Sequence, residues 1–157
     1  MSDPHTCEEH TCAACNAPDL EAFFKKQREI MERVGWIVHY VLDHEEKAVP
    51  FVNAHTHGIL EKYGHADLQI CLATRLGVPT DVIHQMLHAV VRQIEDGVVF
   101  AAGHKSGEVM EGYDVKFVDA EENGRHVLRV LLPDNRGAFP DEPGCTKELA
   151  TQATFAT

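Results

Sequence analysis

Long apolar runs and basic residues are the two features that this sequence lacks most clearly. No run of about eighteen apolar residues occurs, so we expect no membrane-spanning helix. Lysine and arginine number 14 against 25 aspartates and glutamates, which gives a formal net charge of −11. This charge excludes non-specific binding to nucleic acid or anionic lipid, because both need basic patches. The first residues show no charged segment followed by an apolar one, so we expect no secretory signal and a cytoplasmic location.

The motifs of several enzyme classes are also missing. The chain has no GxxxxGKS or GxxxxGKT phosphate-binding loop and no nucleophile elbow. His84 and His88 are one helical turn apart, but Gln85 replaces the glutamate base of the HExxH zinc proteases. We therefore interpret this pair as part of a solvated helix face. With 44% hydrophobic and 25% charged residues, the composition is that of an ordinary globular domain.

Apolar periodicity and residue type predict the regular elements. Apolar residues three and four positions apart indicate helices over 19–34 and 80–96, and β-branched and aromatic runs indicate strands. The expected strands are 36–43, 50–58, 68–74, 98–102, 108–112, 113–119 and 125–133. Asn123 and Gly124 are typical of a hairpin turn between the last two. This order predicts an α+β fold, with a mainly antiparallel sheet of about six strands and two main helices packed on one face.

Cysteines are concentrated ahead of the first predicted helix. Cys7, Cys12 and Cys15 have the spacing CxxxxCxxC, and two thiolates two residues apart can bind one tetrahedral zinc ion. The candidates for the fourth ligand are Cys145, His5 and His10. We therefore predict a structural zinc site, while an unmetallated segment and an iron–sulfur or redox site stay open. The predicted parts of the chain are a metal-binding segment over 1–18, a core domain over 19–137 and a tail over 138–157.

Histidines form a second group on the predicted strand over residues 50–58. Side chains alternate along a strand, so His55 and His57 share one face and can chelate one metal ion. Antiparallel pairing with the next strand would bring His65 close, and Asp67 would add a carboxylate. We predict a second metal site at His55, His57 and His65. The alternatives are a hydrogen-bonded pair without metal and histidines that bind substrate or transfer protons.

Three other histidines are interpreted separately. His104 lies in a glycine-bounded loop, from which it or Asp67 could carry protons. A plain hairpin loop is the alternative for His104. His39 and His126 lie in apolar strands and are interpreted as ordinary sheet residues.

Four sequence blocks follow one another in a recognisable order: GWIVHYVLD, PFVNAHTHGILEKYGHADLQICL, GVVFAAGHKSGEV and YDVKFVDAEENGRHVLRVLLPD. In this order they resemble an uncharacterised bacterial family, the domain of unknown function 4262, over roughly residues 19–136. The resemblance implies a compact bacterial cytoplasmic domain and supplies no reaction. Many members carry a Tyr-Thr-x-Gly-Leu-like block where this chain has AHTHGIL, so the histidine pair marks a subgroup.

These observations predict a zinc-stabilised protein with a histidine-lined cleft that binds or hydrolyses a small polar molecule through a metal-bound water. The alternative is a non-catalytic interaction or regulatory module, such as a toxin-neutralising partner, in which zinc is purely structural. A third hypothesis is metal buffering by the five cysteines and eleven histidines. The small molecule and any protein partner stay unidentified, and a homodimer is left open.

Overall fold

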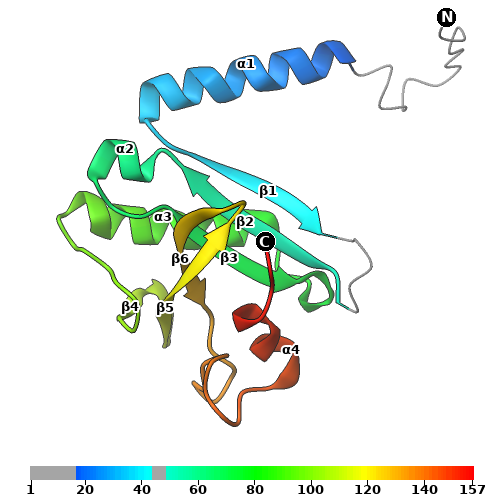
Figure 1. Cartoon of the computed structure of the whole chain (residues 1–157), viewed down its shortest axis with the longest axis vertical. Helices are drawn as coiled ribbons and strands as arrows, with labels where there is room; N and C mark the ends of the chain where they lie inside the picture. The colour runs from blue at the N-terminus through cyan, green and yellow to red at the C-terminus, as the bar shows by residue number, and fades with distance from the viewer. Residues whose placement is uncertain (1–16, 44–48) are drawn as a thin grey trace, which may run out of the picture. The chain divides into compact units, whose positions relative to one another are not determined.

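The structure is a computed structural model that describes the backbone of residues 17–43 and 49–157 and the side chains of 21–42 and 49–157 (Figure 1). The chain divides into two compact units, Met1–Ile37 and Val38–Thr157. The predicted zinc ligands Cys7, Cys12 and Cys15, with the alternatives His5 and His10, lie outside the described residues. The N-terminal zinc site therefore stays a prediction.

The described part of the first unit is dominated by one helix, α1 (Ala17–Val34). It matches the helix that the apolar periodicity predicts over 19–34. The helix ends where Gly35 takes a positive φ of 87° and donates its N–H to the carbonyl of Met31 at 2.8 Å, an arrangement that favours glycine. Among the described residues, no helix combines the length and apolarity needed to cross a membrane.

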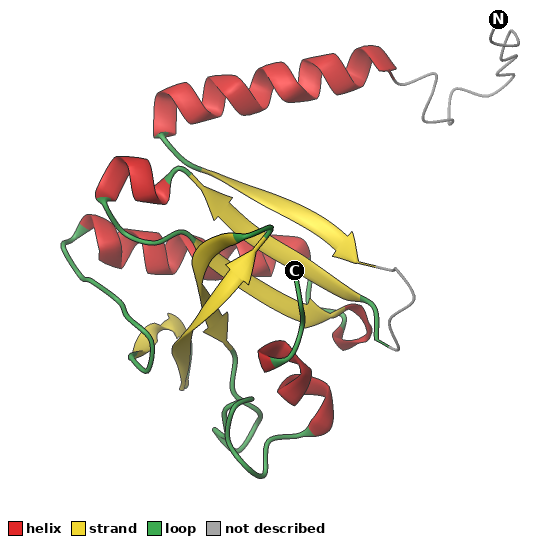
Figure 2. Cartoon of the chain, viewed as in Figure 1, coloured by secondary structure: helices red, strands yellow, loops and turns green. Residues whose placement is uncertain are grey.

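The second unit is built around a mixed sheet (Figure 2). Within the described residues it has six strands, in the order β1 (Ile37–Asp43), β2 (Phe51–His57), β3 (Leu68–Ala73), β6 (Arg125–Leu131), β5 (Tyr113–Glu122) and β4 (Lys105–Met110). The pairs β2–β3, β5–β6 and β4–β5 are antiparallel, and β3–β6 is parallel. The prediction of an α+β fold with a mainly antiparallel sheet is confirmed.

The two faces of this sheet differ in what they carry. Helix α3 (Thr80–Glu95) buries one apolar face made of Ile83, Met86, Leu87, Val90, Val91 and Ile94. On β1, Tyr40 contacts α3 while the adjacent His39 contacts histidines of β2. Because neighbouring residues of a strand point to opposite faces, α3 covers one face and the histidines lie on the other. The placement of both main helices on one face stays a prediction for α1, which belongs to the first unit.

The predicted tail over 138–157 is a folded part of the second unit. It contains α4 (Lys147–Ala150) and a 3-10 turn, η2 (Thr151–Ala153), both of which contact β3. The side chain of Gln152 is fully buried and exchanges hydrogen bonds of 2.9 Å with both backbone groups of Leu132. The ring of Phe155 stacks on that of Phe51 at a centroid distance of 3.9 Å. The C-terminal segment therefore covers part of the sheet face that carries the histidines.

Two local expectations need correction. Residues 98–102 form a loop instead of a strand, and Val99 is exposed. The backbone N–H of Phe100 bonds to the ring of His65 and not to a neighbouring strand, so β-branched character alone misled the prediction. The sequence also gave no warning of α2 (Ile59–Tyr63), a short helix that follows β2.

Asp134 organises the loop that leads from β6 to the C-terminal segment. The carboxylate is buried and accepts backbone N–H groups from Arg136 and Ala138 at 2.9 Å and from Thr146 at 3.2 Å. These hydrogen bonds, led by that of Ala138, lower the pKa of Asp134 below its ordinary 3.8.

We expect Asp134→Asn to lower the stability of the protein at neutral pH, because the amide group cannot accept at both positions. A lowered folded pKa stabilises the fold above the unfolded pKa, and this contribution is lost as the pH falls through the folded value. The stability difference between the variant and the wild type should therefore shrink below the ordinary pKa of 3.8. Urea denaturation at neutral pH and in acid measures it. A difference that stays constant over this range would contradict the prediction.

Candidate metal centre

Three histidines from two strands meet on the sheet face opposite α3. His55 and His57 come from β2 and His39 from β1, and one ring nitrogen of each lies within 4.8 Å of the others. The ring centroids are 4.5 Å apart for His39 and His57, 5.0 Å for His55 and His57, and 5.8 Å for His39 and His55. His55 is buried, His57 is half-buried and His39 is exposed, so the cluster opens to solvent on the side of β1.

Strand β2 ends directly after the second of its histidines. Gly58 takes a φ of 103° and begins α2, a backbone conformation that residues with a Cβ rarely adopt. The N–H of Ile59, the first residue of α2, donates to the carboxylate of Asp67 at 3.1 Å. The turn therefore fixes the end of β2 and with it the position of His57.

A chain of hydrogen bonds fixes which ring nitrogen of His55 carries the proton. Arg129 can only donate, and its Nε bonds to Oε1 of Gln69 at 2.8 Å. The amide nitrogen of Gln69 must then donate to Oδ1 of Asn53, at 3.0 Å. The same oxygen lies 3.1 Å from Nδ1 of His55, so Nδ1 carries a hydrogen and donates it. In the neutral ring, Nε2 therefore presents its lone pair.

Burial keeps the imidazoles neutral. It lowers the pKa of His55 to about 4, and the nearby carboxylate of Glu122 offsets this only in part. Burial is also the largest cause that lowers the pKa of His57 and His39 below the ordinary 6.5. Burial therefore favours the neutral form at all three positions, and this is the form that binds metal ions.

The carboxylate of Glu122 faces the lone pair of His55. Its Oε1 lies 3.3 Å from Nε2 of His55, and both side chains are largely buried. With His55 neutral, two electron-rich atoms face each other, and a cation between them would stabilise the arrangement. Glu122 is not in the group whose ligand atoms all lie within 4.8 Å of one another, so its carboxylate lies beside the three imidazoles and not among them.

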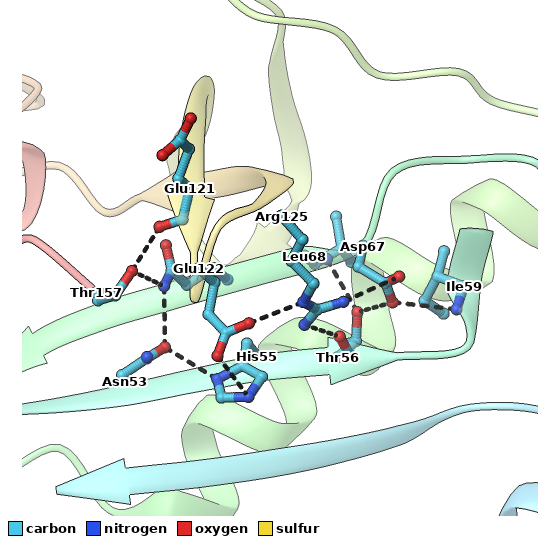
Figure 3. Close-up of polar contacts among 11 residues, drawn as sticks. Asn53, His55, Thr56, Ile59, Asp67, Leu68, Glu121, Glu122, Arg125 and Thr157 are labelled. Atoms are coloured by element: carbon cyan, nitrogen blue, oxygen red, sulfur yellow. Dashed lines mark hydrogen bonds and ion pairs between the residues drawn. The ribbon is translucent and has the colours of Figure 1, made fainter.

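Glu122 is itself held by Arg125 (Figure 3). The Nε of Arg125 bonds to Oε2 of Glu122 at 2.8 Å, its Nη1 lies 3.3 Å from Asp67, and its Nη2 donates to the carbonyl of Thr56 at 2.7 Å. Burial alone would raise the pKa of Glu122, but the hydrogen bond and the charge of Arg125 act in the opposite direction, and the pKa is lowered. Glu122 is therefore ionised beside the histidines.

The β5–β6 hairpin brings Glu122 and Arg125 together. Asn123 and Gly124 both take positive φ, 48° and 78°, as the two central residues of a type I′ turn do. This turn sets Glu122 directly opposite Arg125 in the ladder. The hairpin turn that the sequence predicts is confirmed.

The other predicted site residues lie elsewhere. Both ring nitrogens of His65 contact backbone groups, Nδ1 the carbonyl of Ala66 at 2.8 Å and Nε2 the N–H of Phe100 at 3.0 Å. The third imidazole of the cluster is therefore His39 and not His65. Asp67 is buried and accepts from the hydroxyl of Thr56 at 2.8 Å. Its carboxylate pairs with Arg125 and is not directed at the three histidines.

His104 and Cys145 are also outside the cluster. His104 lies just before β4, at the opposite edge of the sheet from β1, and its Nδ1 accepts the N–H of Ala101 at 3.1 Å. Cys145 is a half-buried free thiol, and burial raises its pKa. No contact between Cys145 and the other predicted zinc ligands can be tested, because those ligands lie in the part of the chain that is not described.

Sequence reasoning missed two of the important groups, His39 and Glu122. Antiparallel pairing of the first two predicted strands would have suggested that His39 lies opposite the pair on β2. For Glu122 the signal was the turn at Asn123 and Gly124, since a two-residue hairpin loop makes its flanking residues neighbours.

Comparison with known proteins gives a family and no activity. A family model described as a domain of unknown function, DUF4262, matches residues 30–146. No curated protein and no solved structure matches the chain. The chemistry of the site must therefore be derived from its own residues.

Proposed function

The chain belongs to the DUF4262 family, whose description names no reaction, and we propose from the histidine cluster that it binds a divalent transition-metal ion and acts on a small polar molecule. The ligands are His39, His55 and His57. The observation that carries this proposal is the convergence of one nitrogen from each ring within 4.8 Å, together with the hydrogen bond from Nδ1 to Asn53, which leaves the lone pair of the neutral His55 ring on Nε2. Metal-binding histidines commonly donate their other ring N–H in this way.

The ligand set favours a catalytic centre over a structural one. Three histidines are the protein ligands of one class of catalytic zinc sites, which leave a further position open for water or substrate. Imidazole also suits copper, iron and nickel, so zinc is the first choice and not the only one. Glu122 lies on the buried side of the centre and His39 on the solvent side, which leaves a small molecule an approach from solvent.

Metal-assisted hydrolysis is the reaction class that these groups support best. A metal ion bound here would make its water ligand acidic enough to attack an electrophilic centre near neutral pH. Glu122, ionised and within 3.3 Å of Nε2 of His55, is placed to accept a proton beside the centre. Arg125 positions the Glu122 carboxylate through the 2.8 Å hydrogen bond. Asn53 positions His55.

Elemental analysis of the untagged full-length protein tests metal binding. We expect His55→Ala to lose one metal ion that Cys12→Ser retains. A second ion lost only in Cys12→Ser would identify the predicted N-terminal zinc site separately. Metal content unchanged in His55→Ala would end the proposal.

Glu122→Gln tests the chemistry. We expect this variant to keep the metal ion and to lose hydrolysis of a panel of small esters, amides and phosphoesters by about a hundredfold or more, the usual effect of removing a general base. Glu121→Gln is the matched control, because Glu121 is the adjacent residue and its side chain is exposed. Metal binding without any hydrolysis in the wild type would favour the binding or regulatory function over the enzyme.

A further inference from the structure

Helix α3 carries a second histidine pair on the opposite side of the sheet from the metal centre. His84 and His88 are half-buried and lie one turn apart, with ring centroids 4.5 Å apart and ring planes inclined by 44°. Residues four positions apart on a helix share one face, and two histidines at this spacing can bind one metal ion. The sequence alone favours a solvated face for the pair, and the proposed metal centre does not use it.

Tyr40 of β1 determines the orientation of His84. The phenolic oxygen of Tyr40 lies 3.3 Å from the carbonyl of Thr80 and 3.2 Å from Nδ1 of His84. A carbonyl can only accept, so the single hydroxyl hydrogen of Tyr40 is donated to Thr80. Both contacts are hydrogen bonds only if Nδ1 of His84 carries a hydrogen and donates it to Tyr40. In the neutral ring, the lone pair of His84 is therefore on Nε2.

The contact between His84 and Tyr40 has the same form as the contact between His55 and Asn53. In both places an oxygen of a neighbouring group accepts the N–H of Nδ1 and leaves Nε2 for a ligand bond. His88 has two ring nitrogens, so one can coordinate the metal ion while the other stays available for a hydrogen bond. Burial lowers the pKa of His88, as do the neighbouring charges of His84 and Arg92, while Glu95 raises it. The charge of Asp81 adds to burial in raising the pKa of Tyr40.

We propose that His84 and His88 form a second, independent site for a divalent transition-metal ion that prefers imidazole ligands, such as Zn²⁺, Ni²⁺ or Cu²⁺. Water completes its coordination. With two protein ligands instead of three, and on a helix face that solvent reaches, this site binds metal more weakly than the three-histidine centre. The centre therefore fills first, and the helix site fills at higher metal concentration. Such a pair of sites gives the metal-buffering hypothesis a structural basis.

Long-range ¹H–¹⁵N spectra of the imidazole rings test this proposal during a zinc titration of the full-length protein. These spectra distinguish the two ring tautomers and report coordination at each histidine, so zinc bound by the N-terminal cysteines does not obscure the result. We expect His84 with its proton on Nδ1 before zinc is added. The signals of His55 should change first, and those of His84 and His88 at higher zinc. Rings of His84 and His88 that do not respond at any zinc concentration that keeps the protein soluble would overturn the proposal.

Variants separate this site from the first centre. His88→Ala should abolish the zinc response of His84, while His126→Ala, which removes an exposed histidine of β6, should leave it intact. His55→Ala should remove the first centre only and leave the helix response unchanged. Tyr40→Phe keeps both ligands and removes the orienting oxygen, so we expect zinc affinity at the helix site to fall about tenfold to a hundredfold. An unchanged response of His84 in His88→Ala, with folding verified by circular dichroism, would contradict a shared metal ion.

Discussion

Replacing His55 with alanine is expected to lower the zinc affinity of the three-histidine centre by about a hundredfold or more, since even the loss of an outer-shell partner costs 10–100-fold. His55 is the most buried of the three rings, and both its nitrogens face polar groups, Nδ1 the side-chain oxygen of Asn53 and Nε2 the carboxylate of Glu122. No neighbouring histidine can take its place, because His65 is held by backbone groups on both nitrogens. Isothermal titration with zinc measures the effect.

The titration should use a chain in which the three N-terminal cysteines are serine, so that thiolates do not compete for zinc. His104→Ala is the matched control, because His104 is exposed and lies at the far edge of the sheet. The zinc affinity of this variant should equal that of the parent protein. His39→Ala should weaken binding less than His55→Ala does, since water can replace an exposed ligand. Equal affinities in the parent and in His55→Ala would show that the centre does not bind zinc.

The part of the site that lies within one strand could be predicted from sequence. Alternation along β2 is enough to place His55 and His57 on one face, and Gly58 marks the end of the strand. The third ring could not be identified in this way, because it depends on which strands pair. The sequence prediction chose His65, from the pairing with the following strand, and interpreted His39 as an ordinary sheet residue. The structure favours His39, because the ring of His65 turns to the N–H of Phe100 in a loop that the sequence presented as a strand.

The supporting groups were harder to predict, because they come from β3 and β6, two strands whose pairing the sequence did not predict. Gln69 and Arg129 look like interruptions in apolar strands, yet each is buried and hydrogen-bonded to the next. Arg129 also donates to the carbonyls of Gln152 and Phe155 at 3.0 and 2.9 Å. The parallel pairing of β3 with β6 sets Gln69 opposite Arg129. A buried polar side chain in a strand thus indicates that a hydrogen-bond partner is present. Identifying that partner requires knowledge of which strands are neighbours in the sheet.

Arg125 is the residue whose loss should cost the fold most. Its guanidinium lies between the carboxylates of Glu122 and Asp67, whose side chains are 11% and 5% exposed. Removal of one partner from a buried ion pair leaves an uncompensated charge and typically costs 3–5 kcal/mol. We expect Arg125→Met to lower the free energy of unfolding by about 3 kcal/mol, because part of the guanidinium is in contact with solvent. Urea denaturation followed by circular dichroism measures it.

Two comparisons separate charge from packing in this effect. Arg136→Met is the matched control, because the Arg136 side chain is largely exposed and lies 3.6 Å from the carboxylate of Asp134, which keeps its three backbone hydrogen bonds without it. We expect this solvent-screened contact to contribute about 0–1 kcal/mol. Adding Asp67→Asn to Arg125→Met should restore part of the lost stability, since one of the two unpaired charges is removed. A loss in Arg125→Met no larger than in Arg136→Met would contradict the ionic explanation.

The same variant connects the stability of the fold to the proposed metal ion. In the wild type, one oxygen of the Glu122 carboxylate is paired with Arg125 and the other faces His55. A metal ion at the three histidines would therefore lie near the oxygen that Arg125 does not contact. Without Arg125 that ion becomes the main positive charge near Glu122, and a ligand that binds the folded state stabilises it in proportion to its affinity. Zinc should therefore raise the unfolding free energy of Arg125→Met more than that of the wild type. Adding His55→Ala should abolish this extra stabilisation, and if it persists, the zinc responsible is bound at another site.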